Sequence, residues 1–292
     1  KNKISHLMKH ILVIPVYNDS RSLNKLIENL NIALKKNKKI EHEILVINDN
    51  SSEKININIK RFKAIKKLSM ITLKKNLGSQ KAIAVGLRYL KSKKKNFLIT
   101  VMDGDGEDDP KQVLKMIDNA NQNPKYIVTS NRKRREESLI IVSLYKLHLI
   151  ITFLFTWKWI SFGNFSTFYK DNLKNLLSNN YSWYAHSSSV LKNCNIIRLY
   201  SKRKKRYFDK SKLGLISLIE HSLRVNVVFY KNIFLMSLVY LFSIFFLFEN
   251  NIKILLSSGI LFFNLLILII KLKHWIKNIS SISKFIKKID SV

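Results

Sequence analysis

The sequence predicts an α/β fold built on a doubly wound, largely parallel sheet. Short apolar runs typical of buried strands alternate with segments in which apolar residues recur at helical spacing. A polar turn follows each of these apolar runs. Alternating strands and helices are typical of a parallel sheet covered by helices on both faces. We therefore expect the polar turns along one edge of the sheet, where folds of this class bind their ligands.

The elements can be placed in order along the first half of the chain. The expected strands are 11–16, 44–47, 71–73, 97–102 and 126–129. The expected helices are 23–34, 82–90 and 111–120, the last opened by Pro110 at a first helical turn. No Gly-x-Gly-x-x-Gly motif and no phosphate loop ending in Gly-Lys-Ser/Thr is present. Their absence from the sequence disfavours a dinucleotide-binding protein or an ordinary ATPase.

An acidic turn follows the central strand. Within seven positions it holds Asp103, Asp105, Glu107, Asp108 and Asp109, in a chain with 19 acidic and 52 basic residues. Carboxylates this close together repel one another unless a cation lies among them. Asp103 and Asp105 are two positions apart, so in an extended segment they point the same way and could offer oxygen ligands to Mg²⁺ or Mn²⁺. A solvated acidic turn is the alternative. A helix-loop-helix calcium loop is excluded, because its sixth and twelfth positions hold Asp108 and Leu114.

The composition limits the class of protein. A chain of 292 residues has room for one large domain or two smaller ones. Its formal charge of +33 suits nucleic acid or an anionic membrane surface, although a general preference for lysine, asparagine and isoleucine would explain the scattered lysines. Cys194 is the single cysteine, which excludes an internal disulfide or a cysteine-based zinc site and agrees with a reducing compartment. The apolar run after the basic start is too short for a signal peptide.

Two apolar runs in the last quarter predict a membrane hairpin. Phe229–Phe248 and Ile252–Ile270 are each long enough to cross a bilayer, and only Glu249, Asn250 and Asn251 separate them. The lysines after the second run favour the compartment of the N-terminal domain for the C-terminus. The isoleucines at 279, 282, 286 and 289 fall on one helical stripe with Trp275. This stripe predicts a tail helix, either resting on the membrane or packed on its neighbours.

A third apolar segment, 138–162, is expected to lie in the membrane interface. Leu139–Phe155 is almost as apolar as a membrane span, but Lys146 and His148 interrupt it. A lysine at the centre of a span is costly. Trp157 and Trp159 follow, and tryptophans are typical of the headgroup level. An amphipathic segment lying along the surface fits these residues better than a third crossing.

An ordered set of motifs carries a family resemblance. The set comprises Pro15-Val16-Tyr17-Asn18-Asp19, Val46–Glu53, Asn76–Ala82, Asp103-Gly104-Asp105-Gly106-Glu107 with Pro110, Gly163–Ser166, and Arg206 with Ser211-Lys212. From about Ile11 to Ile270 the chain resembles family 2 glycosyltransferases of the polyprenyl-phosphate type, similar to dolichyl-phosphate mannosyltransferases and bacterial undecaprenyl-phosphate glycosyltransferases. It departs from the family's usual residues at Asn48, Glu107, Asn164, Ser166 and Asp209. The family usually has an acid, a glutamine, an acid, an arginine and a glycine there.

The resemblance implies a GT-A-like sheet with interfacial helices and a C-terminal two-helix hairpin. It implies a cytoplasmic nucleotide-sugar-binding domain at 1–226, the hairpin at 227–271 and a basic amphipathic tail at 272–292. The donor-binding residues it implies are Pro15, Tyr17, Asp19, Asp49, Lys81 and Asp103. Asp103 and Asp105 would hold Mg²⁺ or Mn²⁺, and Glu107 would contact the sugar or support the metal site. A core aromatic at Tyr17 and a turn residue at Asp49 are the plainer interpretations.

The sequence offers few candidates for a general base, and this favours a phosphate over a hydroxyl group as the acceptor of the sugar. A hydroxyl acceptor normally requires one, yet between Ser166 and Arg206 the sequence offers only Asp171, at an expected helix start, and His186, a type of residue that is more often structural. A lipid phosphate is already an anion and needs cations instead. The residues expected to bind the acceptor phosphate are Arg132, Arg135, Arg206, Ser211 and Lys212. A solvated basic face is the alternative for the run 202–212.

These observations predict a glycosyltransferase that moves a sugar from a UDP- or GDP-sugar to polyprenyl phosphate on the cytoplasmic face of the inner membrane. Asp105, Glu107 and Arg206 would lie at the reaction centre, and Mg²⁺ or Mn²⁺ would be required. The bilayer is an expected partner and nucleic acid is not; the oligomeric state, a homo-oligomer included, is left open. Two alternatives remain: transfer to a saccharide hydroxyl in cell-surface polysaccharide synthesis, and a catalytically weak membrane scaffold that retains the fold.

Overall fold

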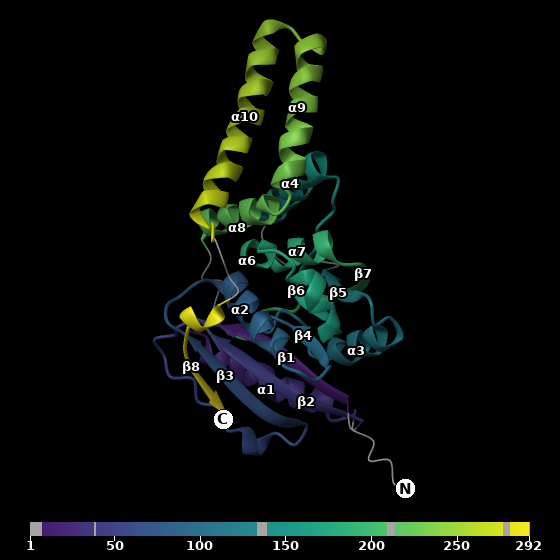
Figure 1. The fold of residues 1–292 in the computed structure, drawn as a ribbon, viewed down its shortest axis with the longest axis vertical. Helices are drawn as coiled ribbons and strands as arrows, with labels where there is room; N and C mark the ends of the chain where they lie inside the picture. The colour runs from purple at the N-terminus through teal and green to yellow at the C-terminus, as the bar shows by residue number, and fades with distance from the viewer. Residues whose placement is uncertain (1–7, 38, 133–138, 209–213, 277–280, 292) are drawn as a thin grey trace.

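The fold is organised around one eight-stranded sheet in a computed structural model that describes residues 8–37, 39–132, 139–208, 214–276 and 281–291 (Figure 1). The strand order is β7-β5-β6-β4-β1-β2-β3-β8. The strands are β1 Met8–Val16, β2 Ile40–Asn48, β3 Ile65–Leu73, β4 Leu98–Val101, β5 Ile127–Arg132, β6 Phe162–Tyr169, β7 Ile196–Ser201 and β8 Ile286–Ser291. Only β6 and β8 run antiparallel to their neighbours in this sheet. The predicted α/β fold with a largely parallel sheet is confirmed.

Helices cover both faces of the sheet, which explains the continuous apolar strands. The helices on one face are α1 Ser20–Leu34 and α3 Gln112–Gln122, and on the other α2 Ser79–Lys91, α5 Leu173–Leu176, α6 Tyr181–Tyr184 and α7 His186–Asn193. Successive side chains of β1 point to opposite faces. Leu12 and Ile14 are buried with α1, whereas Ile11 and Val13 are buried with α2. Each face therefore has its own apolar core.

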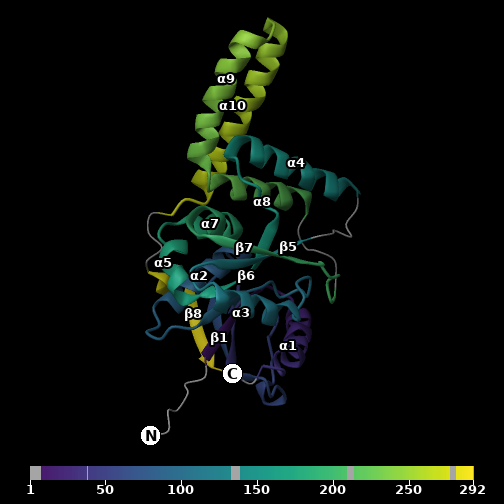
Figure 2. The same ribbon diagram turned by 90° about the vertical axis from the view of Figure 1, so that its right-hand side faces the viewer.

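A helical hairpin extends away from the sheet (Figures 1 and 2). It consists of α9 Tyr230–Leu247 and α10 Asn250–Lys273, the two helices in the described part of the chain that are long and apolar enough to cross a membrane. Two further helices, α4 Leu139–Thr156 and α8 Leu215–Val227, lie crosswise at its base. Helices that lie along a membrane surface are expected to have this crosswise orientation. The polar edge of the sheet is on the same side of the sheet as the hairpin.

The tail differs from the sequence prediction. A 3₁₀ turn at Ile282–Lys284 is followed by β8, which pairs antiparallel with β3 so that Ile289 lies opposite Ile71. The predicted helix through the isoleucine stripe is therefore wrong. The physical reason is the open edge of β3, whose backbone groups would otherwise lack partners. Phe285 also packs on Trp183, with ring centres 5.0 Å apart, which joins the returning chain to the α2 side of the core.

Candidate active site

The site lies where three neighbouring parallel strands end. Because β4, β1 and β2 are adjacent and parallel, their carboxyl ends bring three polar loops to one edge of the sheet. The loop after β1 carries Asp19, the loop after β2 carries Asp49, and the loop after β4 carries Asp103 and Asp105. The sequence predicted this gathering, and the structure shows it.

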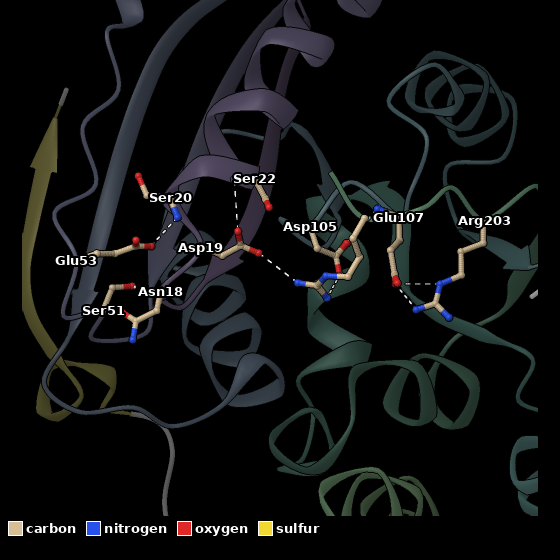
Figure 3. A network of polar contacts seen from close by, with 10 residues as sticks. Asn18, Asp19, Ser20, Ser22, Ser51, Glu53, Asp105, Glu107 and Arg203 are labelled. Carbon is tan, nitrogen blue, oxygen red and sulfur yellow. Dashed lines mark hydrogen bonds and ion pairs between the residues drawn. The ribbon is translucent and has the colours of Figure 1, made fainter. Parts of the chain in front are cut away.

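The first two loops are joined by hydrogen bonds (Figure 3). The Asn18 N–H donates to Ser51 Oγ at 3.0 Å, and the Ser52 N–H donates to Asn18 Oδ1 at 2.8 Å. Asn18 adopts a φ of 46°, a left-handed conformation that asparagine tolerates better than most residues. The Ser20 N–H donates to Glu53 Oε1 at 2.6 Å. These contacts fix the position of Asp19 at the start of α1.

Asp49 holds the loop before α2. Its two oxygens accept the N–H groups of Leu77 and Gly78, each at 2.7 Å. Burial raises the pKa of this carboxyl from its usual value to about 6, while the two N–H bonds act in the opposite direction. Gly78 has a φ of 86°, which an L-residue rarely adopts. Asp49 therefore has a structural partner for both oxygens, beside its predicted donor-binding role.

Arg206 joins two carboxylates from different loops. Its Nη1 donates to Asp105 Oδ2 at 2.9 Å, and its Nη2 donates to Asp19 Oδ2 at 3.2 Å. Arg206 Nε is buried and has no hydrogen-bond partner among the described residues. Asp19 also caps α1, since its Oδ1 accepts the Ser22 N–H at 3.4 Å. The three side chains are partly buried, with side-chain exposures of 16–23%. The pairs are thus shielded from solvent more than surface ion pairs are.

The basic segment 202–207 lies along the acidic turn. Two backbone hydrogen bonds join them, from Lys204 N–H to the Glu107 carbonyl at 2.9 Å and from Tyr207 N–H to the Asp105 carbonyl at 3.1 Å. Glu107 accepts from Arg203, whose Nε lies 2.9 Å away (Figure 3). Arg203 and Arg206 therefore each pair with an acid of the turn, and Lys204 adds a 3.0 Å pair with Asp109.

Behind Asp103, buried polar side chains form a continuous hydrogen-bonded chain. Asn164 Nδ2 donates to Asp103 Oδ1 at 2.9 Å, and Gln80 Nε2 donates to Asn164 Oδ1 at 3.0 Å. Gln80 Oε1 accepts the N–H of His186 at 2.7 Å. The His186 ring is fully buried and its Nε2 lies 2.9 Å from Ser166 Oγ. Burial lowers the pKa of His186 to about 4, so the ring is neutral near pH 7.

Neither of the two general-base candidates is placed to serve. His186 is enclosed behind β6. Asp171 accepts from Asn96 Nδ2 at 3.1 Å, beside Phe97 at the start of β4. Asp103 follows the other end of this strand. Asp171 therefore lies at the edge of the sheet opposite the acidic turn.

The oxygens of Asp103 and Asp105 suit a hard divalent cation. Mg²⁺ commonly uses one or two protein carboxylates and completes its shell with substrate phosphates and water. No group of three His, Cys, Asp or Glu side chains is placed to hold a metal within the described ranges, which is compatible with such a two-carboxylate site. Asp105 already contacts Arg206, so a metal there would have to share or replace this partner. The donor set fits Mg²⁺ or Mn²⁺ on that condition.

Of the other predicted site residues, some have described side chains and the rest lie wholly or partly outside the described part of the chain. Tyr17 is 43% exposed and lies two positions before Asp19, and Pro15 lies one position before the end of β1 at Val16. Lys81 instead contacts the Trp183 ring, with its Nζ 5.3 Å from the ring centre. Arg135, Ser211 and Lys212 lie outside the described residues, and Arg132 is described only as the last backbone position of β5. Contacts that sequence reasoning missed come from Arg203, Gln80, Asn164 and Tyr207. The sequence marks these residues only by their positions, inside the family motifs or inside the basic run 202–212.

The model of glycosyl transferase family 2 matches residues 11–186, which is more than half of the chain. The chain belongs to this family. The match runs from β1 to the start of α7 and includes the three carboxyl-end loops and the acidic turn. Family membership thus agrees with the placement of Asp19, Asp49, Asp103 and Asp105 at one edge of the sheet.

Two relatives of this family 2 glycosyltransferase illustrate the likeness. A dodecaprenyl-phosphate galacturonate synthase from Rhizobium johnstonii is 25% identical over 134 residues, covering 44% of this chain and 38% of that protein. The match thus spans well under half of the relative's length. Residues 1–349 of S. aureus TarS, solved with UDP-GlcNAc, superpose with a TM-score of 0.50 at 15% identity, covering 79% of this chain and 70% of that chain. The second likeness shows the fold.

Proposed function

We propose that this family 2 glycosyltransferase transfers a sugar from a nucleotide diphosphate sugar to polyprenyl phosphate at a membrane surface. The observation that carries the proposal is the contact of the basic segment 202–207 with the acidic turn, through Arg206 and Asp105. Arg206, the cation expected to bind the acceptor phosphate, thus lies beside the carboxylates expected to serve the donor. The Rhizobium relative is named as a synthase of dodecaprenyl-phosphate galacturonate, and this supports a lipid phosphate as the acceptor. The UDP-GlcNAc in the TarS structure supports a nucleotide-sugar donor.

The residues divide the chemistry between them. Asp103 and Asp105 would hold Mg²⁺ or Mn²⁺, which supplies charge neutralisation for the departing diphosphate when bound. Asn164 holds the Asp103 carboxylate in place through its 2.9 Å hydrogen bond. Arg206 would orient the acceptor phosphate, because its planar fork suits phosphate oxygens. Both Nη groups of Arg206 are bonded to carboxylates, so the acceptor phosphate must use the remaining N–H groups of the guanidinium or displace Asp19 or Asp105. Glu107 positions Arg203 and contacts the sugar.

A hydroxyl acceptor is less well supported by the same geometry. It needs a base near the anomeric carbon, and both candidates, Asp171 and His186, lie away from the acidic turn. A phosphate monoester brings its own nucleophilic oxygen and needs only orientation. In the experiment below, transfer to a saccharide would support the saccharide acceptor, and no transfer at all would support the inactive scaffold.

We further propose that 1–226 forms the cytoplasmic catalytic domain, that 227–271 crosses the inner membrane twice and that 138–162 lies in its interface. The crosswise position of α4 and α8 beneath the hairpin supports this topology (Figure 2). With two crossings, both termini share the compartment of Asp105. The tail supports the same arrangement, since β8 returns from the hairpin to pair with β3 of the catalytic sheet.

The proposal is tested with the full chain in detergent, incubated with labelled UDP- and GDP-sugars, polyprenyl phosphate and Mg²⁺ or Mn²⁺. Label in the organic phase is expected with one donor, and it should disappear in EDTA. Asp105→Asn should reduce this label by about 100-fold or more, since it removes a group that serves the transition state. Asp118→Asn, which removes an exposed carboxylate from α3, is the matched control and should retain activity. Transfer only to a water-soluble saccharide, or no transfer with any donor, would contradict the proposal.

A further inference from the structure

A second group of cationic side chains gathers on the membrane-facing side of the catalytic domain, apart from the Asp19–Arg206–Asp105 contacts. Lys81 comes from α2, Arg224 from α8 and His274 from the residue after α10. These elements converge beneath the hairpin (Figure 1). Lys81 and Arg224 both contact Trp183: Lys81 Nζ lies 5.3 Å from its ring centre, and Arg224 Nη2 donates to its carbonyl at 3.4 Å.

The acids near this cluster are already engaged. Glu220, one turn before Arg224 on α8, accepts from Lys273 Nζ at 2.7 Å and from His274 Nε2 at 2.8 Å. Asp49, whose charge also acts on Lys81, is bonded to two backbone N–H groups. Lys75 adds a further positive charge near Lys81. Positive charge therefore exceeds negative charge around the Trp183 side chain.

Several polar groups of the cluster have no partner among the described residues. Arg224 Nε and His274 Nδ1 are buried without a hydrogen bond in the described part of the chain. The Lys81 ammonium has no ion pair or hydrogen bond there, and its contact is the face of Trp183. Leaving a buried polar donor unpaired typically costs about 1–3 kcal/mol. A bound acceptor of hydrogen bonds would satisfy Arg224 Nε and the Lys81 ammonium. It would also satisfy His274 Nδ1 once the ring is protonated, because Nε2 already donates to Glu220.

The charges of the cluster would favour a bound anion. Burial, together with the positive charges of Arg224 and Lys75, lowers the pKa of Lys81 to about 8. Burial likewise lowers the pKa of Arg224. The pKa of His274 is lowered by burial and by Arg224 and Lys81, although Glu220 opposes these effects. An anion placed among the three would favour the charged form of each.

We propose that Lys81, Arg224 and His274 form a binding site for a phosphate monoester. A guanidinium fork, an ammonium and an imidazolium N–H together match the several oxygens and the double charge of such a group. The phosphate is carried by a lipid or is free in solution. The membrane side is close, because α8 exposes Leu215, Ile216 and Ile219, with Ile216 83% exposed, and leads into α9. The proposal concerns binding and does not depend on sugar transfer.

The test uses the full chain in a neutral detergent with ¹³C-labelled histidine. Dodecyl phosphate serves as the lipid-like probe, methyl phosphate as the soluble one and dodecanol as the uncharged one. We expect saturable binding that raises the pKa of His274 by about 1, as an anion within 4–6 Å does. His221, exposed on α8, reports any general change in surface potential and should respond less. His274→Gln assigns the signal.

Affinity measurements on variants locate the site. Arg224→Gln is expected to weaken phosphate binding about tenfold or more, because it removes a charge-assisted donor. Lys231→Gln removes an exposed charge at the same level, at the start of α9, and should change affinity less than about twofold. Lys81→Gln provides a second variant if Arg224→Gln does not fold.

The outcomes are distinct. Tighter binding of dodecyl phosphate than of methyl phosphate identifies a lipid headgroup, and equal binding identifies free phosphate as the ligand. If neither probe moves the His274 signal beyond that of His221, the site does not exist. Equal losses in Arg224→Gln and Lys231→Gln would mean general attraction of anions to a basic surface, and would overturn the proposal as well. Loss of sugar transfer with intact phosphate binding would count against the proposed function alone.

Discussion

Arg206 Nη1 lies 2.9 Å from Asp105 Oδ2, although 101 positions separate the two residues in the chain. The contact places the expected acceptor-phosphate residue on one of the two expected metal-binding carboxylates. A cation at Asp105 and an anion at Arg206 would each compete with this ion pair. Binding of the two substrates is therefore expected to be coupled through it.

The first prediction concerns this pair. Arg206→Gln should raise the KM for polyprenyl phosphate about tenfold or more while leaving the donor KM at saturating Mn²⁺ nearly unchanged, since losing one partner of a desolvated pair typically costs about 2–5 kcal/mol. Mn²⁺ should bind the variant more tightly, because Asp105 loses its competing cation. Steady-state kinetics and free-Mn²⁺ measurements check both.

The matched control for Arg206 is Lys204→Gln, which removes a charge from the same segment but one that pairs with Asp109 and is 47% exposed. Lys204→Gln should change the KM for polyprenyl phosphate and the affinity for Mn²⁺ only slightly. If the two variants show the same small loss and added salt removes the difference, the segment only attracts the protein to the membrane.

The second prediction concerns topology. A cysteine introduced at Ser161, after α4, in a Cys194→Ser background should react with an impermeant thiol reagent only from the cytoplasmic side. Ser161 precedes β6, which pairs with β4 in the catalytic sheet. A third crossing would place this strand across the membrane from Asp105, which the sheet forbids. Labelling from the outside alone would rule out the proposed topology.

The third prediction concerns Gly106, which has a φ of 87°. A Cβ there would lie 2.3 Å from the Tyr207 ring, and the ring's hydroxyl accepts from Asn29 Nδ2 at 2.8 Å. Gly106→Ala should therefore separate segment 202–207 from the acidic turn, lowering the Tm and the transfer rate together. Backbone strain of this kind typically costs about 1–3 kcal/mol.

Comparison with Tyr207→Ala and the double variant separates the two causes. If the ring clash dominates, Tyr207→Ala should recover part of the Tm lost in Gly106→Ala, as the non-additivity of neighbouring substitutions allows. Gly214→Ala is a control, since a Cβ there meets no atom within 4 Å. A normal Tm for Gly106→Ala would show that the turn readily adopts another conformation.

The sequence was sufficient for the parts of this site that depend on local pattern. The apolar run before Asp103 and the acids after it are neighbours in the chain, so strand, turn and sheet edge could be predicted together. The strand β6 was not predicted, because its buried residues include polar ones such as Ser166 and Thr167 rather than a plain apolar run. Hydrogen bonds within the protein offset the cost of burying these polar side chains. Such bonds cannot be detected from the periodicity of apolar residues. The strand β7 was not predicted either, because its short apolar run is interrupted by Arg198 and is mostly only partly buried.

Long-range partners could not be predicted in the same way. Arg203 and Glu107 are 96 positions apart, and Asn164 lies 61 positions from Asp103. Their pairing depends on how β6 and the segment after β7 return to the acidic turn. The tail shows the same limit, because its isoleucine spacing suited a helix while the unpaired edge of β3 selected a strand.

The fourth prediction follows from that tail. Phe285 packs on Trp183 and on the α2 side of the core, and its carbonyl accepts the Lys74 N–H at 2.9 Å. Phe285→Ala should lower the free energy of unfolding by about 2 kcal/mol, less than truncation of a fully buried aromatic does, because Phe285 is partly buried. Ser283→Ala, two residues earlier in an exposed position, is the control. An unchanged Tm for Phe285→Ala would indicate that β8 contributes little to the domain.

The last prediction concerns pH and a buried histidine pair. His10 Nδ1 lies 2.9 Å from His42 Nδ1, and His10 Nε2 lies 2.8 Å from Thr100 Oγ1. Burial lowers the pKa of His42 to about 4 and that of His10 well below its usual value, so both rings are neutral in the folded protein.

Because the unfolded histidines bind protons near pH 6.5, stability is lost as pH falls from about 6.5 towards 4. For His42 alone the loss between pH 7 and pH 5 is about 2 kcal/mol. Asp49 acts with the opposite sign in this window, since its raised pKa favours the folded state as pH falls, so wild type and variant must be compared. The Tm of His42→Asn should fall less between pH 7 and pH 5 than that of the wild type. His221→Asn, at an exposed site, should follow the wild type. Parallel curves for wild type and His42→Asn would show that the pair does not sense pH.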